Sequence, residues 1–222
     1  MDELNKLRID LYGLDYKVTN FKIDNMVGTS LPRAKIKMSK VKQCIKKYYK
    51  DEKISLLDFP ISESVELTMC YFAIGLLRCK NFIEQMEFLD KNLKYANSWM
   101  ITDVCPQYIK KSTYEAYEPY FYKFSKSKEE YKRRFAYVYL IRFYKDKKVE
   151  EFKDYIFDDE RYYVYMAEAW MLATFAIFDE EGVFSFLNEK EINGKLKRKT
   201  ISKICDSYRI EEDIKEKFKG LR

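Results

Sequence analysis

Apolar residues recur at helical spacing along the chain. Val65, Met69, Phe72 and Leu76 follow one another at steps of four, three and four residues. This spacing places all four side chains on one stripe of a helix, so we predict a helix over about residues 63–79. The same pattern, with turn residues as boundaries, predicts further helices at about residues 161–177, 180–188, 195–207 and 211–219.

A capping motif predicts the start of another helix. Ser127 and Glu130 have the S-x-x-E spacing, in which the hydroxyl bonds to the third amide and the carboxylate reaches back to the first. We therefore expect a helix from Lys128 to about Tyr144. Its segment 135–141 is apolar on more than one face, which indicates that neighbouring helices cover it on both sides.

The spacing of rare residues suggests a helical repeat. Trp99, Arg134 and Trp170 are separated by about 35 residues, close to the ~40-residue period of HEAT-type solenoids. Only 6 glycines and 4 prolines occur in 222 residues, too few for the frequent turns of an all-β chain. We predict an all-α protein with ten or more helices in antiparallel pairs, no β-sheet, and one HEAT-like solenoid domain over residues 1–222 with a concave basic face.

Positive charge is concentrated in one segment. The formal net charge is +6, but residues 33–50 carry eight basic side chains and no acidic one, so the rest of the chain sums to −2. Two interpretations remain open at this point: a solvated helix surface, or a binding surface for a polyanion such as DNA or RNA. The second interpretation makes Lys35, Lys42 and Lys46 candidates for phosphate contacts.

Composition excludes several kinds of chemistry. The chain has no histidine, which removes Ser-His-Asp and Cys-His pairs and histidine-containing zinc sites. None of the five cysteines forms a C-x-x-C pair, so we expect reduced thiols, no metal site and no cofactor. The longest apolar helical segments reach about half of the ~20 residues that a membrane span needs. We therefore expect a cytoplasmic protein that does not enter a membrane.

Four segments, in order along the chain, resemble one known family. Residues 97–103 contain a Trp-x-x-x-Asp pattern, residues 132–136 place Arg134 at the start of an apolar helix, residues 162–170 end in a second tryptophan, and residues 201–210 form a late helix. Together they are similar to the AlkD-like DNA alkylation repair glycosylases. The resemblance implies a HEAT-like solenoid that holds duplex DNA containing alkylated bases and excises N3- or N7-alkylated purines.

The resemblance also implies the site residues, which are Trp99, Asp103, Arg134 and Trp170. An alkylated purine is cationic and leaves without a general acid, so one carboxylate suffices to stabilise the oxocarbenium-like sugar and to orient water. We assign this role to Asp103, one helical turn after Trp99. Trp170 would form a second wall, and Arg134, with Lys132 and Arg133 beside it, would contact phosphate.

An aromatic cluster has two possible interpretations. It comprises Tyr114, Tyr117, Tyr120, Phe121, Tyr122 and Phe124, and lysines lie nearby in the sequence. Interleaved aromatic and basic residues suit stacking on unpaired bases. We favour a packed pair of helices instead, because Glu115 and Glu118 within the cluster would repel phosphate.

Two other functions compete with the enzyme. The chain departs from the family pattern after Trp170, where Met171 begins an apolar run in place of an Arg-Glu pair. A non-catalytic HEAT-like module that binds distorted or branched DNA is one alternative, and a protein-interaction scaffold is the other. In each case we expect a monomer.

Overall fold

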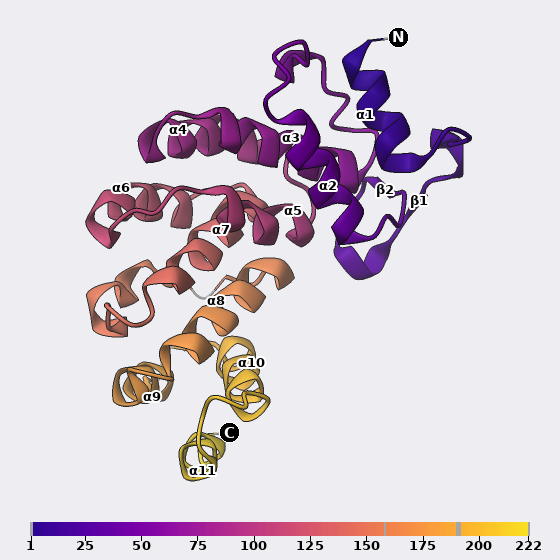
Figure 1. Ribbon diagram of the computed structural model, residues 1–222. Helices are drawn as coiled ribbons and strands as arrows, with labels where there is room; N and C mark the ends of the chain where they lie inside the picture. Colours follow the sequence, from indigo (N-terminus) through magenta and orange to yellow (C-terminus); the bar gives the residue numbers. More distant parts are fainter. Residues whose placement is uncertain (1, 158, 190–191, 222) are drawn as a thin grey trace. The chain divides into compact units, whose positions relative to one another are not determined.

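The computed structural model describes residues 2–157, 159–189 and 192–221. Within these ranges the chain forms eleven α-helices and one small two-stranded sheet (Figure 1). The predicted all-α class is confirmed. The chain divides into two compact units, Met1–Ser112 and Thr113–Arg222, here called the N-terminal and the C-terminal unit. The HEAT-like solenoid stays a prediction.

In the N-terminal unit, helix α3 is the central element. Its residues from Val65 to Leu76 are buried, and it packs against α2, α4, α5 and β2. The Ser64 hydroxyl accepts a hydrogen bond from the Leu67 amide at 3.0 Å and so caps the first turn. The elements of this unit are α1 (Glu3–Tyr12), β1 (Lys22–Ile23), β2 (Pro32–Arg33), α2 (Met38–Tyr48), α3 (Val65–Arg78), α4 (Phe82–Asn92) and α5 (Trp99–Val104).

The prediction that no sheet forms is wrong in one place. Strands β1 and β2 pair antiparallel, with Lys22 opposite Arg33. Gly28 between them adopts the left-handed conformation at φ 57°, which allows the chain to turn back on itself. The Arg33 guanidinium then bonds to Asp24 at 3.1 Å and to the buried Glu66 at 3.3 Å. The pair with Glu66 fixes the short ladder to helix α3, and the pair with Asp24 joins β2 to the connection between the strands.

In the C-terminal unit, helix α8 lies between α7 and α10, while α6 packs against α7 and α11 against α10 (Figure 1). The elements are α6 (Tyr114–Ser125), α7 (Glu130–Leu140), α8 (Tyr162–Phe175), α9 (Glu180–Asn188), α10 (Gly194–Cys205) and α11 (Glu212–Lys219). The helices predicted for this part of the chain are confirmed, with small shifts at their ends. None of the helices in the described part of the chain is both long and apolar enough to cross a membrane.

The predicted capping box at Ser127 is not formed. Helix α7 begins at Glu130, two residues later than predicted, and the Ser127 hydroxyl accepts from the Glu129 amide at 3.1 Å. The Arg133 side chain donates to the Ser127 carbonyl at 3.0 Å. This bond holds Ser127 in the loop, so the helix starts after it. The helix ends at Leu140 and continues as a short 3-10 turn.

The core of the C-terminal unit is aromatic. Tyr117, Phe121 and Phe124 on α6 are fully buried with Phe135 and Tyr139 on α7. The rings of Tyr117 and Tyr139 meet edge to face with their centroids 4.6 Å apart, a favoured geometry for aromatic pairs. The Tyr117 hydroxyl donates to the Ala136 carbonyl at 2.9 Å. The packed-helix interpretation of the aromatic cluster is therefore confirmed.

Candidate functional site

Helix α5 presents Trp99 and Asp103 together. The Ser98 hydroxyl accepts from the Met100 amide at 3.2 Å and starts the helix. The apolar side of α5, with Ile101 and Val104, is buried, whereas both Trp99 and Asp103 are partly exposed. Residues four apart on a helix share a face. The predicted pairing of indole and carboxylate on one helix is therefore present.

A segment of the N-terminal unit that the sequence analysis missed contacts Trp99. The indole nitrogen donates to the backbone carbonyl of Met26 at 3.4 Å, and the neighbouring Asn97 amide lies 3.5 Å from the Ser30 hydroxyl. Both partners belong to the connection between β1 and β2. This connection has no regular hydrophobic period, so no pattern in the sequence could place it beside Trp99.

Thr102 orients the carboxylate of Asp103. Its hydroxyl lies 3.1 Å from Asp103 Oδ1 and 2.9 Å from the carbonyl oxygen of Trp99, so its single proton is shared between the two acceptors. Thr102 itself is buried. A hydrogen bond from a fixed, buried group reduces the freedom of the carboxylate, which is the kind of support that a catalytic side chain needs. The motif spacing singled out Trp99 and Asp103 but gave no signal for Thr102.

Trp170 is exposed between buried neighbours on helix α8. Its side chain is 39% exposed, whereas Ala169 and Met171 on either side are buried. It lines a groove of about 310 Å³ in the C-terminal unit. The other lining residues are Ala173, Thr174, Ile177, Lys203, Asp206, Ser207 and Arg209. Trp99 and Asp103 belong to the N-terminal unit and Trp170 to the C-terminal one, and their convergence on one site stays a prediction.

Arg134 is buried within the C-terminal unit. Only 6% of it is exposed, and its Nη1 donates to the carbonyl oxygen of Tyr163 at 2.6 Å. Tyr163 lies in the first turn of α8. The arginine therefore ties α7 to the start of the helix that carries Trp170. The phosphate contact predicted for Arg134 stays a prediction, and this geometry favours a structural role.

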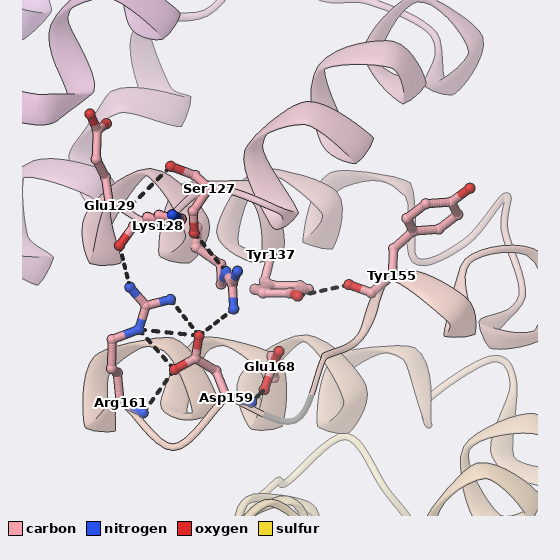
Figure 2. A network of polar contacts seen from close by, with 9 residues as sticks. Ser127, Lys128, Glu129, Tyr137, Tyr155, Asp159, Arg161 and Glu168 are labelled. Atoms are coloured by element: carbon pink, nitrogen blue, oxygen red, sulfur yellow. Dashed lines mark hydrogen bonds and ion pairs between the residues drawn. The ribbon is translucent and has the colours of Figure 1, made fainter.

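Arg133 takes part in an ion-pair network with Asp159 and Arg161. Figure 2 shows how Asp159 and Arg161 lie in this network. Its Nη1 lies 2.6 Å from Asp159 Oδ2, and the same carboxylate accepts from the backbone and side chain of Arg161. Arg161 in turn donates to the Lys128 carbonyl at 2.6 Å. Burial would raise the pKa of Asp159, but the hydrogen bonds from Arg161 and Arg133 outweigh it and lower the pKa to about 2. Lys132 also has a carboxylate partner, Glu129, at 3.4 Å.

The basic segment of the N-terminal unit, residues 33–50, differs from residues 132–134 in its ion-pair contacts. Lys35, Lys42 and Lys46 are exposed, and none of them has a carboxylate within ion-pair distance among the residues that the structure describes. Lys42 and Lys46, one turn apart on α2, line a groove of about 360 Å³ together with Tyr49 and Tyr108. These lysines therefore offer positive charge to solvent.

In the described part of the chain, the acidic and cysteine side chains do not form a metal site or a reactive thiol. Within the described ranges, no three histidine, cysteine, aspartate or glutamate side chains gather to hold a metal ion. All five cysteines are free thiols. Burial raises the pKa of Cys70 and of Cys105, which keeps both in the protonated, unreactive form.

One comparison with known proteins found a matching family. The family described as DNA alkylation repair enzyme matches residues 28–204, a span that includes α2, α5 and α8. Comparison with curated proteins returned no match, and comparison with solved structures returned none either. Membership of this family implies DNA binding. Because the match covers most of the sequence, the chain belongs to the DNA alkylation repair enzyme family.

Proposed function

We propose that the protein is a DNA N-glycosylase that hydrolyses the bond between deoxyribose and an N3- or N7-alkylated purine in duplex DNA. The observation that carries the proposal is the pairing of Trp99 and Asp103 on the exposed face of α5, with Thr102 orienting the carboxylate. The family match includes this helix. It supports a role in DNA repair.

The residues suffice for this reaction without a metal or a cofactor. Alkylation at N3 or N7 gives the purine a positive charge, so the base departs as a neutral molecule and takes the bond electrons with it. The sugar is left with oxocarbenium character. Asp103 opposes that charge and accepts a proton from the attacking water, and both effects are strongest where water is scarce. Trp99 and Trp170 place their ring faces against the sugar and backbone.

Binding and positioning are assigned to the basic residues. Lys35, Lys42 and Lys46 contact phosphates, which fix the protein on the duplex without selecting a sequence. Arg134 acts through the carbonyl of Tyr163 and so positions α8 and its Trp170. Lys132 and Arg133 hold the start of α7 in the same way, through Glu129 and Asp159.

The decisive experiment measures release of 7-methylguanine and 3-methyladenine from methylated duplex DNA by the purified protein. We expect excision by the wild type and a loss of about 100-fold or more in single-turnover rate for Asp103→Asn. DNA affinity should persist or rise slightly, because a negative charge facing phosphate is removed. Asp58→Asn, which neutralises an exposed carboxylate in the same unit, is the matched control and should excise normally.

Three outcomes would contradict the proposal in different ways. Equal excision by Asp103→Asn and wild type would remove Asp103 from the mechanism while leaving the enzyme. DNA binding by the wild type without any base release would instead favour the non-catalytic DNA-binding module. Absence of both binding and excision would favour the protein-interaction scaffold.

A further inference from the structure

Exposed aromatic and basic side chains gather on one surface of the C-terminal unit. Phe178, which follows α8, is 58% exposed and contacts the Tyr144 ring. Tyr208, which follows α10, is 95% exposed and lies in the chain between Ser207 and Arg209, two residues that line the groove beside Trp170. A contiguous exposed patch of apolar side chains marks an interaction site, whereas single exposed ones are ordinary. The basic members of this surface are Lys145, Lys203 and Arg209. Together with Tyr144 and Trp170 we call these residues the Arg209 platform.

Arg209 joins the two parts of the platform. It lines the groove beside Trp170, and its guanidinium carbon lies 5.0 Å from the centre of the Tyr144 ring. Its Nη2 also donates to the Tyr144 hydroxyl at 2.7 Å. The Tyr144 ring meets Phe178 with centroids 5.4 Å apart, and Lys145 lies within 6 Å of both ring centres. Aromatic faces and positive charges therefore alternate from the groove to Phe178.

We propose that the Arg209 platform binds an unpaired DNA strand. Bases stack on Trp170, Phe178 and Tyr208, and the phosphates between them contact Arg209 and Lys203. Aromatic faces with interleaved cations are the usual way in which proteins hold single strands, because every base has a ring face and every linkage a negative charge. In a duplex the base faces are covered by their neighbours, so an aromatic platform of this kind selects unpaired nucleotides.

Charge argues for a strand of nucleic acid rather than an apolar partner. Lys203 and Arg209 line the groove with one carboxylate, Asp206, and Lys145 lies beside the rings of Tyr144 and Phe178. The platform therefore carries three basic side chains against that one carboxylate. Arg209 makes no ion pair within the described residues, and its guanidinium contacts Tyr144. Asp206 is exposed and opposes phosphate, so the strand runs on the side of Lys203 and Arg209.

The inference rests on the proposed function only in taking DNA as the ligand. It adds an unpaired strand to a protein proposed to act on duplex DNA. Such a strand is present where a DNA duplex is opened or distorted. Undamaged oligonucleotides serve as the probe, so the measurement is independent of base excision and of Asp103.

The fluorescence of Trp170 can be used to detect a strand bound to it. Trp99→Phe leaves Trp170 as the sole tryptophan, because the chain has two. Titration with an eight-residue oligothymidylate should quench its fluorescence, since stacking brings base and indole into contact. Tyr208→Ala and Phe178→Leu should each weaken binding about fivefold or more. Anisotropy of a labelled oligonucleotide with the unmodified protein gives the same affinities independently of Trp99→Phe.

Charge variants test the phosphate contacts. Lys203→Gln and Arg209→Gln should each lower the slope of log affinity against log salt by about 0.7, the value for one phosphate of a single strand. Asp206→Asn should tighten binding. Lys195→Gln, an exposed lysine at the other end of α10, and Tyr162→Ala, an exposed tyrosine at the start of α8, are matched controls and should bind as the wild type does.

Three results would overturn the proposal. The first is binding of the single strand without quenching of Trp170. The second is equal quenching by the duplex of the same sequence, which would assign the groove to duplex backbone. The third is unchanged affinity in both Tyr208→Ala and Arg209→Gln. If the quenching is seen and no alkylated base is ever released, the strand-binding inference holds and the proposed glycosylase activity fails.

Discussion

Two basic segments of this protein differ in whether their side chains are exposed or held by contacts within the fold. In residues 33–50, the side chains of Lys35, Lys42 and Lys46 are exposed and have no ion-pair partner among the described residues. In residues 132–134, every basic side chain is held by the fold. Lys132 and Arg133 have carboxylate partners and Arg134 bonds to a backbone carbonyl. Basic residues in the two segments therefore do not contribute equally to the surface potential.

The difference comes from residues distant in sequence. Asp159 follows Arg133 by 26 positions and reaches it because α8 packs on α7. A guanidinium that is buried has to find acceptors, since an unpaired buried charge is costly. On α2 the exposed lysines lie opposite a buried row formed by Val41, Cys44 and Ile45. They contribute solubility and positive potential rather than packing.

The largest expected effect is on DNA affinity. The triple variant Lys35→Gln, Lys42→Gln, Lys46→Gln removes three proposed phosphate contacts. Each contact contributes about 0.9 to the salt slope, so the slope should fall by about 3 and affinity at 0.1 M salt by on the order of 100-fold or more. The measurement is duplex binding at several salt concentrations, with and without alkylation.

A second triple variant, which removes the same number of positive charges, tests whether the position of those charges determines DNA affinity. Lys215→Gln, Lys217→Gln and Lys219→Gln, combined, also remove three positive charges, but these lysines on α11 already contact glutamates. We expect a much smaller change in affinity. Equal losses in the two triple variants would mean that net charge alone governs binding, and that residues 33–50 are an ordinary solvated surface.

The next effect in size concerns Arg134 and separates its two possible roles. Arg134→Met keeps the length of the side chain and removes the bond to the Tyr163 carbonyl. Hydrogen bonds of charged groups contribute about 1.5–3 kcal/mol, so urea unfolding should show a loss of about that size, while the DNA salt slope changes by less than 0.9. Arg142→Met, at an exposed position of the same unit, is the control. A full drop in slope with unchanged stability would establish the phosphate contact.

Asp159 should have a somewhat smaller, pH-dependent effect. Its pKa is lowered from 3.8 to about 2 in the folded protein, so the folded state favours the charged carboxylate and the stabilisation is fully present above about pH 4. It is lost as the pH falls through about 2. We expect Asp159→Asn to cost about 2 kcal/mol at neutral pH, and this difference from the wild type should shrink between pH 4 and pH 2. A constant difference across that window would contradict the assigned ion pairs.

Helix positions could be predicted because their signal is local. Val65 to Leu76 carries a period of 3.6 residues and forms α3, and the helix expected at 180–188 has those bounds in α9. The start of α7 could not be predicted, because the Arg133 bond to the Ser127 carbonyl overrides the capping motif. The ladder of β1 and β2 was missed because strands of two residues have no period.

The candidate site was predictable only as far as motif spacing reaches. Trp99 and Asp103 are four residues apart on one helix, and α5 presents them together. Thr102 and Met26 were not found, since their roles depend on a hydroxyl direction and on a loop without a sequence pattern. The burial of Arg134 likewise follows from the packing of α7 against α8, which no local pattern encodes.

The smallest expected effect separates charge from backbone at Lys35. This residue is exposed and has φ 55°, a left-handed conformation that costs a non-glycine residue about 1–2 kcal/mol. Lys35→Gly relieves that strain and, after the greater flexibility of glycine in the unfolded chain is counted, should stabilise the protein by about 0.5 kcal/mol. Lys35→Gln keeps the strain and should leave stability unchanged. Both variants lose the charge, so both should lower the DNA salt slope by about 0.9. If Lys35→Gly alone weakens binding, the left-handed turn rather than the ammonium group carries the contact.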